Sequence, residues 1–379
     1  MIYLDNSATT PTLPAAADRA RQYMTEEFFN PAAAYSPAVR EERAVNAARK
    51  TVAGAINASG EEIIFTSGGT ESNNMALFGA LKAMRGRGRI IMGATEHPSV
   101  YEPFKGLDQQ YDVQEAAVDH TGAIDLAKLE EIITPDTRFV SVMQVNNEVG
   151  AINDAEAIRR ILKKKAPDAL LHMDGVQGFL KVPFDARHCD FYSISGHKFH
   201  APKGVGALYV RNGVKFAGGQ IGGGQEKNLR SGTTNTPGIM GMEAAVKDYL
   251  GNLSTYRDNM RKCKLRLAQL LNEMPDVLIN GPEAEKGAPH ILNASFMGVR
   301  GEVLLHALEE KEIYVSTGSA CSAHKKGKNR ILNAMGITGE RQEGAIRFSF
   351  CPFNTVEEME KTAEVIASTI SLLRRFKRR

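Results

Sequence analysis

Several polar residues whose side chains could do chemistry stand at the ends of short apolar runs in this sequence: Thr70, His97, Asn147, Asp174 and Lys198. Each lies at or just past the carboxyl end of a run that is expected to form a β-strand. Open α/β sheets bind ligands in the crevice outside those ends. Taken singly, each of these residues is more often part of a turn or a helix cap. Their coincidence predicts one shared site.

The stretch Ser67-Gly68-Gly69-Thr70 indicates what kind of ligand that site would take. It leads into a predicted helix, and it offers backbone N–H groups, a hydroxyl and the positive end of a helix dipole. Such an arrangement suits a phosphate group. Because the stretch matches neither GxGxxG nor GxxxxGK[ST], a dinucleotide or a nucleoside triphosphate is poorly supported.

Lys198 and Asp174 narrow the ligand further. Lys198 follows the apolar run "SIS", where partial burial would favour the neutral amine that forms a Schiff base, although a surface lysine beside the turn "APKG" fits this segment equally well. Asp174 ends the preceding predicted strand, across the same crevice. A lysine imine, a carboxylate facing a pyridinium nitrogen and a phosphate cradle together fit pyridoxal 5'-phosphate (PLP). His97 would cover the ring or shuttle protons, or it is a hydrogen-bonded turn histidine.

Cys321 lies in "STGSACSAHKKGKNR" (316–330), among small residues and before a basic run. A structural cysteine needs an apolar niche, so this composition favours a reactive thiol on a mobile loop. The other three cysteines are Cys189, Cys263 and Cys351, and their wide spacing makes neither a disulfide framework nor a CxxC pair. They are expected to be small buried hydrophobes, and no metal site is expected.

The elements that must position these residues alternate between short apolar runs and amphipathic stretches, as in an α/β fold with a largely parallel sheet. From about residue 240 the texture changes to a long helical pattern (242–274) interrupted near Gly251. Strands are predicted near 290–297 and 343–350, and a helix at 355–376. We therefore expect a large PLP-binding domain over 15–250. A small domain, formed by 1–14 and 251–379, would carry the Cys321 loop.

Composition limits the class of protein. With 42% hydrophobic and 24% charged residues in 379, the chain is typical of globular proteins, and its net charge of +3 gives no reason to expect direct nucleic-acid binding. No apolar run nears the ~18 residues that a membrane helix needs, so no membrane partner is expected. The start "MIYLDNSATTP" has no basic and apolar regions of a signal peptide. A cytoplasmic protein is expected.

With these residues the sequence closely resembles the cysteine desulfurases, PLP enzymes of the aspartate-aminotransferase-like fold (fold type I), and the likeness runs nearly end to end. The ordered series of motifs is more specific than any one of them: "YLDNSATTP" (3–11), "TSGGTESNN" (66–74), "TEH" (95–97), "NNEVG" (146–150), "HMDGVQ" (172–177), "SGHKFHAPKG" (195–204), "GGGQEKNLRSGT" (222–233), "STGSACS" (316–322) and "IRFSF" (346–350).

The resemblance implies roles for these residues. Lys198 would carry PLP, Asp174 would pair with its pyridine nitrogen, His97 would stack on the ring, and Gln177 would contact its phenolic oxygen. The phosphate would be held by residues of two turns and of a neighbouring subunit, which makes a homodimer part of the site: Gly69, Thr70, Ser195, His197 and the neighbour's Thr233. Asn147, beside the cofactor, and Arg347 would bind the substrate carboxylate. A guanidinium matches a carboxylate bidentately, although Arg347 alone would also fit a charged residue on an edge strand.

Cys321 matches the family's nucleophile. The implied reaction converts L-cysteine to L-alanine and leaves the sulfur on Cys321 as a persulfide, after the Lys198 amine has removed the α-proton. The sulfur then passes to an acceptor protein, an iron–sulfur scaffold or a tRNA-thiolating enzyme. Small neighbours leave the loop free to travel, and His324, Lys325 and Lys326 would favour the thiolate.

The chain departs from the family where acceptors would meet it. It has "HKKGKNR" where "SLEPS"-like residues are common, Cys351-Pro352 where a Gly-Arg pair is common, and "LLRRFKRR" as its last residues. The basic residues are solvated charge, or they favour an acidic acceptor or one bound to tRNA. Selenocysteine lyase and aminotransferase activities on the same fold remain alternatives. So does a sulfur-relay partner without turnover, although the presence of Lys198, Asp174, His97 and Cys321 together argues against it.

Overall fold

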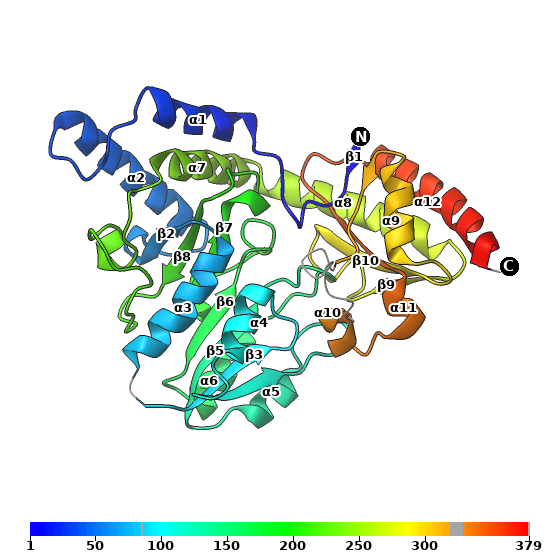
Figure 1. The fold of residues 1–379 in the computed structure, drawn as a ribbon, viewed down its shortest axis with the longest axis horizontal. Coiled ribbons are helices and arrows are strands. Elements are labelled where there is room, and N and C mark those ends of the chain that lie inside the picture. The colour runs from blue at the N-terminus through cyan, green and yellow to red at the C-terminus, as the bar shows by residue number, and fades with distance from the viewer. Residues whose placement is uncertain (85, 319–328, 378–379) are drawn as a thin grey trace.

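The computed structural model describes residues 1–84, 86–318 and 329–377, and its largest element is a seven-stranded sheet (Figure 1). Strand β8 runs antiparallel to both of its neighbours, and all other pairs are parallel, so the carboxyl ends of β2, β3, β5, β6 and β7 meet at one edge. In spatial order the strands are β2 (Ile63–Thr66), β8 (Gly206–Val210), β7 (Phe191–Ser195), β6 (Leu170–Asp174), β5 (Thr137–Met143), β3 (Arg89–Gly93) and β4 (Asp112–Ala116).

Helices cover both faces of this sheet, which explains why its central strands are continuous apolar runs. One face packs against α3 (Gly69–Ala83) and α4 (Pro98–Lys105). The other face packs against a larger group of helices: α1 (Pro14–Thr25), α2 (Ser36–Gly54), α5 (Leu126–Ile132), α6 (Ala155–Lys165) and α7 (Thr236–Gly251). Single-turn 3₁₀ helices occupy Gly60–Glu62, Ala186–His188, Gly196–Lys198 and Glu226–Asn228.

A second hydrophobic core lies in the C-terminal part of the chain. It is built on a three-stranded antiparallel sheet of β9 (Val277–Asn280), β10 (Ile291–Phe296) and β12 (Ala345–Ser349), with β10 in the middle. Helices α8 (Leu253–Asn272), α9 (Gly301–Glu309) and α12 (Val356–Lys377) pack on this sheet, and α10 (Arg330–Ala334) and α11 (Gly339–Glu343) precede β12. The helical pattern expected over 242–274 is indeed interrupted, because α7 ends at Gly251 and α8 begins at Leu253.

The first residues of the chain belong to this second core. Strand β1 (Ile2–Tyr3) pairs in parallel with β11 (Ile313–Tyr314), and Leu4 is fully buried in the core. The chain then crosses to the large sheet and enters α1 (Figure 1). Residues 4–13 therefore run between the two cores. The domain limits of 15–250 and of 1–14 with 251–379 stay a prediction.

In the described residues, every helix is too short or too polar to cross a lipid bilayer.

Candidate active site

The candidate catalytic residues lie at the carboxyl edge of the large sheet, as their positions after predicted strands indicated. Asp174 ends β6, and Lys198 ends the 3₁₀ turn that follows β7. His97 caps α4 a few residues after β3, and Asn147 follows β5. Because these strands are parallel, their ends bring the four side chains to one edge of the sheet.

Asp174 is held by a network that sequence reasoning did not assign. Its side chain is buried, and its Oδ2 accepts a 2.8 Å hydrogen bond from Nδ2 of Asn73 on α3. The same Asn73 nitrogen donates to Ser99 Oγ at 2.9 Å, and Ser99 Oγ lies 2.8 Å from His97 Nδ1. Asn73 therefore links the Asp174 carboxylate to the His97 imidazole through Ser99.

This network also fixes the tautomer of His97. The backbone N–H of Ser99 donates to His97 Nδ1 at 3.1 Å, so Nδ1 is an acceptor and the proton of the neutral ring sits on Nε2. Burial lowers the pKa of His97, the Asp174 carboxylate opposes that shift, and the positive charges of Lys198 and Arg330 add to it. His97 is thus kept neutral with an N–H on its outer nitrogen.

Lys198 is anchored by the N-terminal segment. Its Nζ donates to the backbone oxygens of Ser7 and Ala8, each at 2.7 Å. Gln177 Nε2 donates to the same Ser7 oxygen at 3.0 Å, which places Gln177 beside the lysine. The sequence offered "YLDNSATTP" as a motif but no role for it, because a backbone carbonyl carries no side-chain signature.

A pocket of about 360 Å³ opens at the start of α3, and its lining includes residues that were expected to hold a phosphate: Ser67, Gly68, Gly69, Thr70, Ser195 and His197. Four lining residues were not predicted: Thr9, Glu71, Lys203 and Gly204. Gly69 leaves no room for a side chain, because an added Cβ would lie 2.6 Å from Val176 Cγ2. His197 Nδ1 lies 3.1 Å from Thr9 Oγ1, and burial together with Lys198 and Lys203 lowers the pKa of His197 to about 4.

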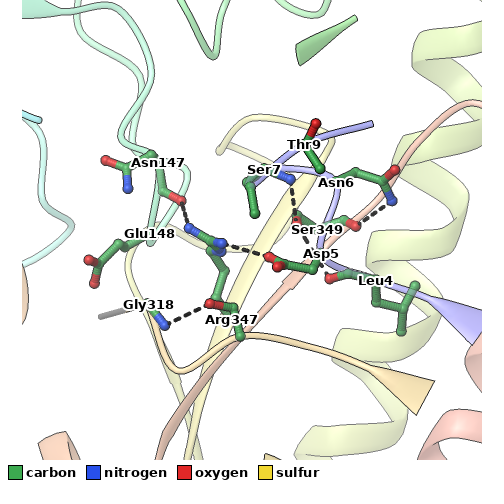
Figure 2. A network of polar contacts seen from close by, with 12 residues as sticks. Leu4, Asp5, Asn6, Ser7, Thr9, Asn147, Glu148, Gly318, Arg347 and Ser349 are labelled. Atoms are coloured by element: carbon green, nitrogen blue, oxygen red, sulfur yellow. Dashed lines mark hydrogen bonds and ion pairs between the residues drawn. The ribbon is translucent and has the colours of Figure 1, made fainter. Parts of the chain in front are cut away.

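Arg347 lies in β12 and approaches the site from the second core (Figure 2). Its Nη1 donates to the backbone oxygen of Asn147 at 3.0 Å, and its Nη2 donates to Asp5 Oδ1 at 2.7 Å. Only 4% of Arg347 is exposed. The Nε of Arg347 is buried and has no hydrogen-bond acceptor among the described residues. The buried Oδ1 of Asn147 likewise has no hydrogen-bond donor among them. The two Nη nitrogens of the guanidinium are thus held by hydrogen bonds, and its Nε–H is available to a bound molecule.

Thr233 is not among the residues that line the pocket at the start of α3. Thr233 is exposed on the segment between β8 and α7. Cys321 lies outside the described residues, as do the neighbouring basic residues His324, Lys325 and Lys326. The segments that border it are described, and both end near Glu148, a buried residue of "NNEVG" to which the sequence assigned no role. Within the described chain, no set of histidine, cysteine and acidic side chains is arranged to bind a metal ion.

Comparison with known proteins agrees with this geometry. The model of the aminotransferase class-V family matches residues 2–362. The cysteine desulfurase IscS of Escherichia coli is 38% identical over 382 residues, covering 98% of this chain and 93% of that protein. The chain belongs to the cysteine desulfurase family. Membership confirms the expected α/β fold of the PLP fold type I class and the expected enzyme class.

Solved structures of cysteine desulfurase relatives have the same fold. A NifS-like protein is 36% identical, with a TM-score of 0.91 over 98% of this chain and 99% of its own. The structure of SspA in complex with cysteine is 29% identical, with a TM-score of 0.81 over 94% of this chain and 100% of its own. The cysteine desulfurase fold therefore extends over nearly the whole of this chain.

Proposed function

We propose that this chain is a PLP-dependent cysteine desulfurase in which Cys321 takes the sulfur of L-cysteine as a persulfide. The observation that carries the proposal is that Lys198 and Asp174 lie at the carboxyl edge of the large sheet, where Arg347 from β12 reaches the Asn147 carbonyl and a pocket opens at the start of α3. Each of the three can hold a different part of an amino acid and its cofactor. The family relationship supports the same reaction.

The residues of the crevice fit PLP. The pocket at the start of α3 suits the phosphate, with Gly69, Thr70, Ser195 and His197 in its lining. Asp174 supplies a buried carboxylate for the pyridine nitrogen, and His97 lies near it through Asn73 and Ser99. Gln177 Oε1 and Asn147 Oδ1 are buried and have no partner in the described part of the chain. Orphaned buried polar atoms at a site indicate groups that a bound molecule satisfies.

When bound, PLP stores the electron pair that the α-carbon of the amino acid releases. The side chains supply the rest. Arg347 binds the substrate carboxylate, and Lys198 takes the α-proton on its Nζ. His97, neutral with its proton on Nε2, can donate that N–H to the bound substrate or cofactor. The Cys321 thiol gains the substrate sulfur: the carbon–sulfur bond breaks, a sulfur–sulfur bond forms, and the products are L-alanine and a Cys321 persulfide.

Other parts of the proposal concern partners. An exposed Thr233 suits a contact with the phosphate pocket of a second copy, so we include a homodimer in the proposed enzyme. The sulfur acceptor is a protein, an iron–sulfur scaffold or a tRNA-thiolating enzyme, and a cytoplasmic location stays a prediction. Sulfur transfer to a purified acceptor at low salt, with Lys325, Lys326 and Lys328 neutralised, tests the basic run; unchanged transfer would remove it from the proposal.

The decisive experiment adds L-cysteine and a reductant to the PLP-loaded enzyme and quantifies alanine and sulfide, with wild type and Cys321→Ser side by side. We expect equal amounts of both products from wild type and neither from the variant. Absorbance near ~410–420 nm that disappears in Lys198→Ala marks the lysine-bound cofactor. A Cys321→Ser enzyme that still turns over an amino acid would favour an aminotransferase. A protein that PLP cannot colour would favour a partner without turnover.

A further inference from the structure

Glu148 is a buried carboxyl next to Asn147 that the proposed reaction does not use. Its backbone is fixed on both sides: its N–H donates to Asn146 Oδ1 at 2.9 Å, and its carbonyl accepts from Asn293 Nδ2 at 3.2 Å. The residue is 5% exposed. A buried acidic side chain on a rigid turn at the edge of an active site calls for a role.

The carboxyl of Glu148 lies beside both residues that border the segment containing Cys321. On one side, Asn329 Nδ2 donates to Oε2 at 2.6 Å. On the other side, Gly318 lies so close that an added Cβ would be 2.8 Å from the same oxygen, and its φ of +78° also favours glycine. Figure 2 shows Glu148 beside Gly318 and next to Asn147. One oxygen atom, Glu148 Oε2, therefore lies beside both Gly318 and Asn329.

Asn329 is itself fixed to the body of the protein. Its Oδ1 caps α10 by accepting from the N–H groups of Ile331 at 3.0 Å and Leu332 at 3.1 Å. Its backbone oxygen accepts from Gln342 Nε2 at 3.1 Å. The amide nitrogen that reaches Glu148 is thus held by a helix cap, and the contact joins two rigid elements.

We propose that Glu148 is a positioning residue that fixes the base of the Cys321 segment beside Arg347. Its carboxyl sets the separation of Gly318 and Asn329, and the adjacent Asn147 carbonyl holds the Arg347 guanidinium. The turn at Asn147-Glu148 thereby ties the substrate-binding arginine to both ends of the segment that brings the thiol. The inference rests on the proposed function, because it concerns the encounter of Cys321 with the substrate sulfur.

The electrostatics of Glu148 give this contact a pH dependence. Burial raises the pKa of Glu148 to about 7, against the hydrogen bond from Asn329 and the positive charges of Arg347 on β12 and Arg330 on α10. The carboxyl is therefore largely neutral at pH 6 and largely charged at pH 8. A hydrogen bond to a charged acceptor is stronger than one to a neutral acceptor. The hydrogen bond from Asn329 to Glu148 therefore becomes stronger as pH rises through 7.

Two substitutions change the hydrogen bond between Glu148 and Asn329 while keeping the shape of both side chains. Glu148→Gln keeps the shape and an acceptor but cannot be charged. Asn329→Asp keeps the oxygen that caps α10 but loses the amide donor and faces the carboxyl with a like charge. In the double variant, the new amide at position 148 can donate to the new carboxylate at position 329, so donor and acceptor are exchanged. Glu131→Gln, on the exposed side of α5, is the matched control.

The measurement is the rate at which the PLP-loaded enzyme forms the Cys321 persulfide in a single turnover, from pH 6 to pH 8. Misplacement of a reacting group by about 1 Å can cost 10²-fold, so we expect Asn329→Asp to slow this step by about 10-fold to 100-fold. The double variant should recover most of that loss, and the rate of Glu148→Gln should rise less between pH 6 and pH 8 than the rate of Glu131→Gln, because only the ionisation of Glu148 is removed. The alkylation of Cys321 by iodoacetamide should be unchanged, because a free reagent does not depend on position.

Several outcomes would overturn the inference. If Asn329→Asp and Glu148→Gln have the same rate and pH profile as Glu131→Gln, the hydrogen bond between Glu148 and Asn329 does not position Cys321. A fall in alkylation that equals the fall in persulfide formation would assign Glu148 to the chemistry of the thiol instead. A lack of recovery in the double variant would show that Asn329→Asp acts elsewhere. Turnover by Cys321→Ser would refute the proposed function itself, which none of these results does.

Discussion

Asp5 is the only acidic side chain within the described residues that forms an ion pair with Arg347, and removing it gives the sharpest prediction for the site. The pair joins the first residues of the chain to β12 across 2.7 Å. Its Arg347 side chain is 5% exposed and its Asp5 side chain 21%. Asp5→Ala would leave a buried guanidinium with the Asn147 carbonyl as its one hydrogen-bond partner among the described residues.

The expected cost follows from these contacts. Breaking a fully buried pair costs about 3–5 kcal/mol, but Asp5 is partly exposed, so the cost of a lost charged hydrogen bond, about 1.5–3 kcal/mol, is the better measure. We expect the free energy of unfolding to fall by that amount. A guanidinium free to turn also binds the substrate carboxylate less well, and KM for L-cysteine should rise about 10-fold, equivalent to about 1.4 kcal/mol.

The assay measures alanine formation over a range of L-cysteine concentrations, with urea unfolding in parallel. Asp5→Asn is the matched variant, because it keeps an oxygen for Nη2 and loses only the charge, and it should show a smaller rise in KM. Lower stability with an unchanged or lower KM would refute the reasoning, since Asp5 would then hold the fold together or compete with the substrate.

Three further predictions follow from other contacts. Gly69→Ala places a methyl against Val176 Cγ2 and should weaken PLP binding, measured by dialysis and reconstitution, whereas adding Val176→Ala should restore it. Asn73→Ala leaves the buried Asp174 Oδ2 without its donor, and urea unfolding should show a loss of about 1–3 kcal/mol; no loss would mean that water replaces the amide. Burial lowers the pKa of His172 to about 4 from its ordinary 6.5, so the unfolded chain binds that proton first. Stability should therefore fall as pH drops from 6.5 towards 4, by up to about 1.4 kcal/mol per pH unit from this group, and a His172→Gln variant should lack that part of the fall.

The sequence contained the local features of the site. Asp174 and Lys198 follow apolar runs, and Gly68-Gly69 precedes a helical pattern, so the ends of parallel strands could be recognised without knowing how the strands pair. The break between α7 and α8 could also be predicted, because Gly251 interrupts the helical pattern. The direction of β8 was not, because a short apolar run looks alike in parallel and antiparallel sheets.

Contacts between distant parts of the chain could not be predicted in this way. Asn73 and Asp174 are 101 residues apart, and Asp5 and Arg347 are 342 apart. Neither separation has a periodic pattern, and only packing brings these side chains together. The carbonyls that hold Lys198 belong to Ser7 and Ala8, and any residue would supply the same oxygen atoms. Residue types alone did not reveal these parts of the site.

The crossing of residues 4–13 between the two cores has a consequence for biosynthesis. Asp5 leaves the ribosome 342 residues before its partner Arg347, about 20–70 s earlier at ordinary rates of translation. Until β12 is synthesised, Asp5 has no Arg347 to pair with. The nascent chain therefore lacks the arginine that is proposed to bind the substrate carboxylate. The last strand of the described chain therefore completes the proposed carboxylate site, and a chain that stops before β12 lacks Arg347.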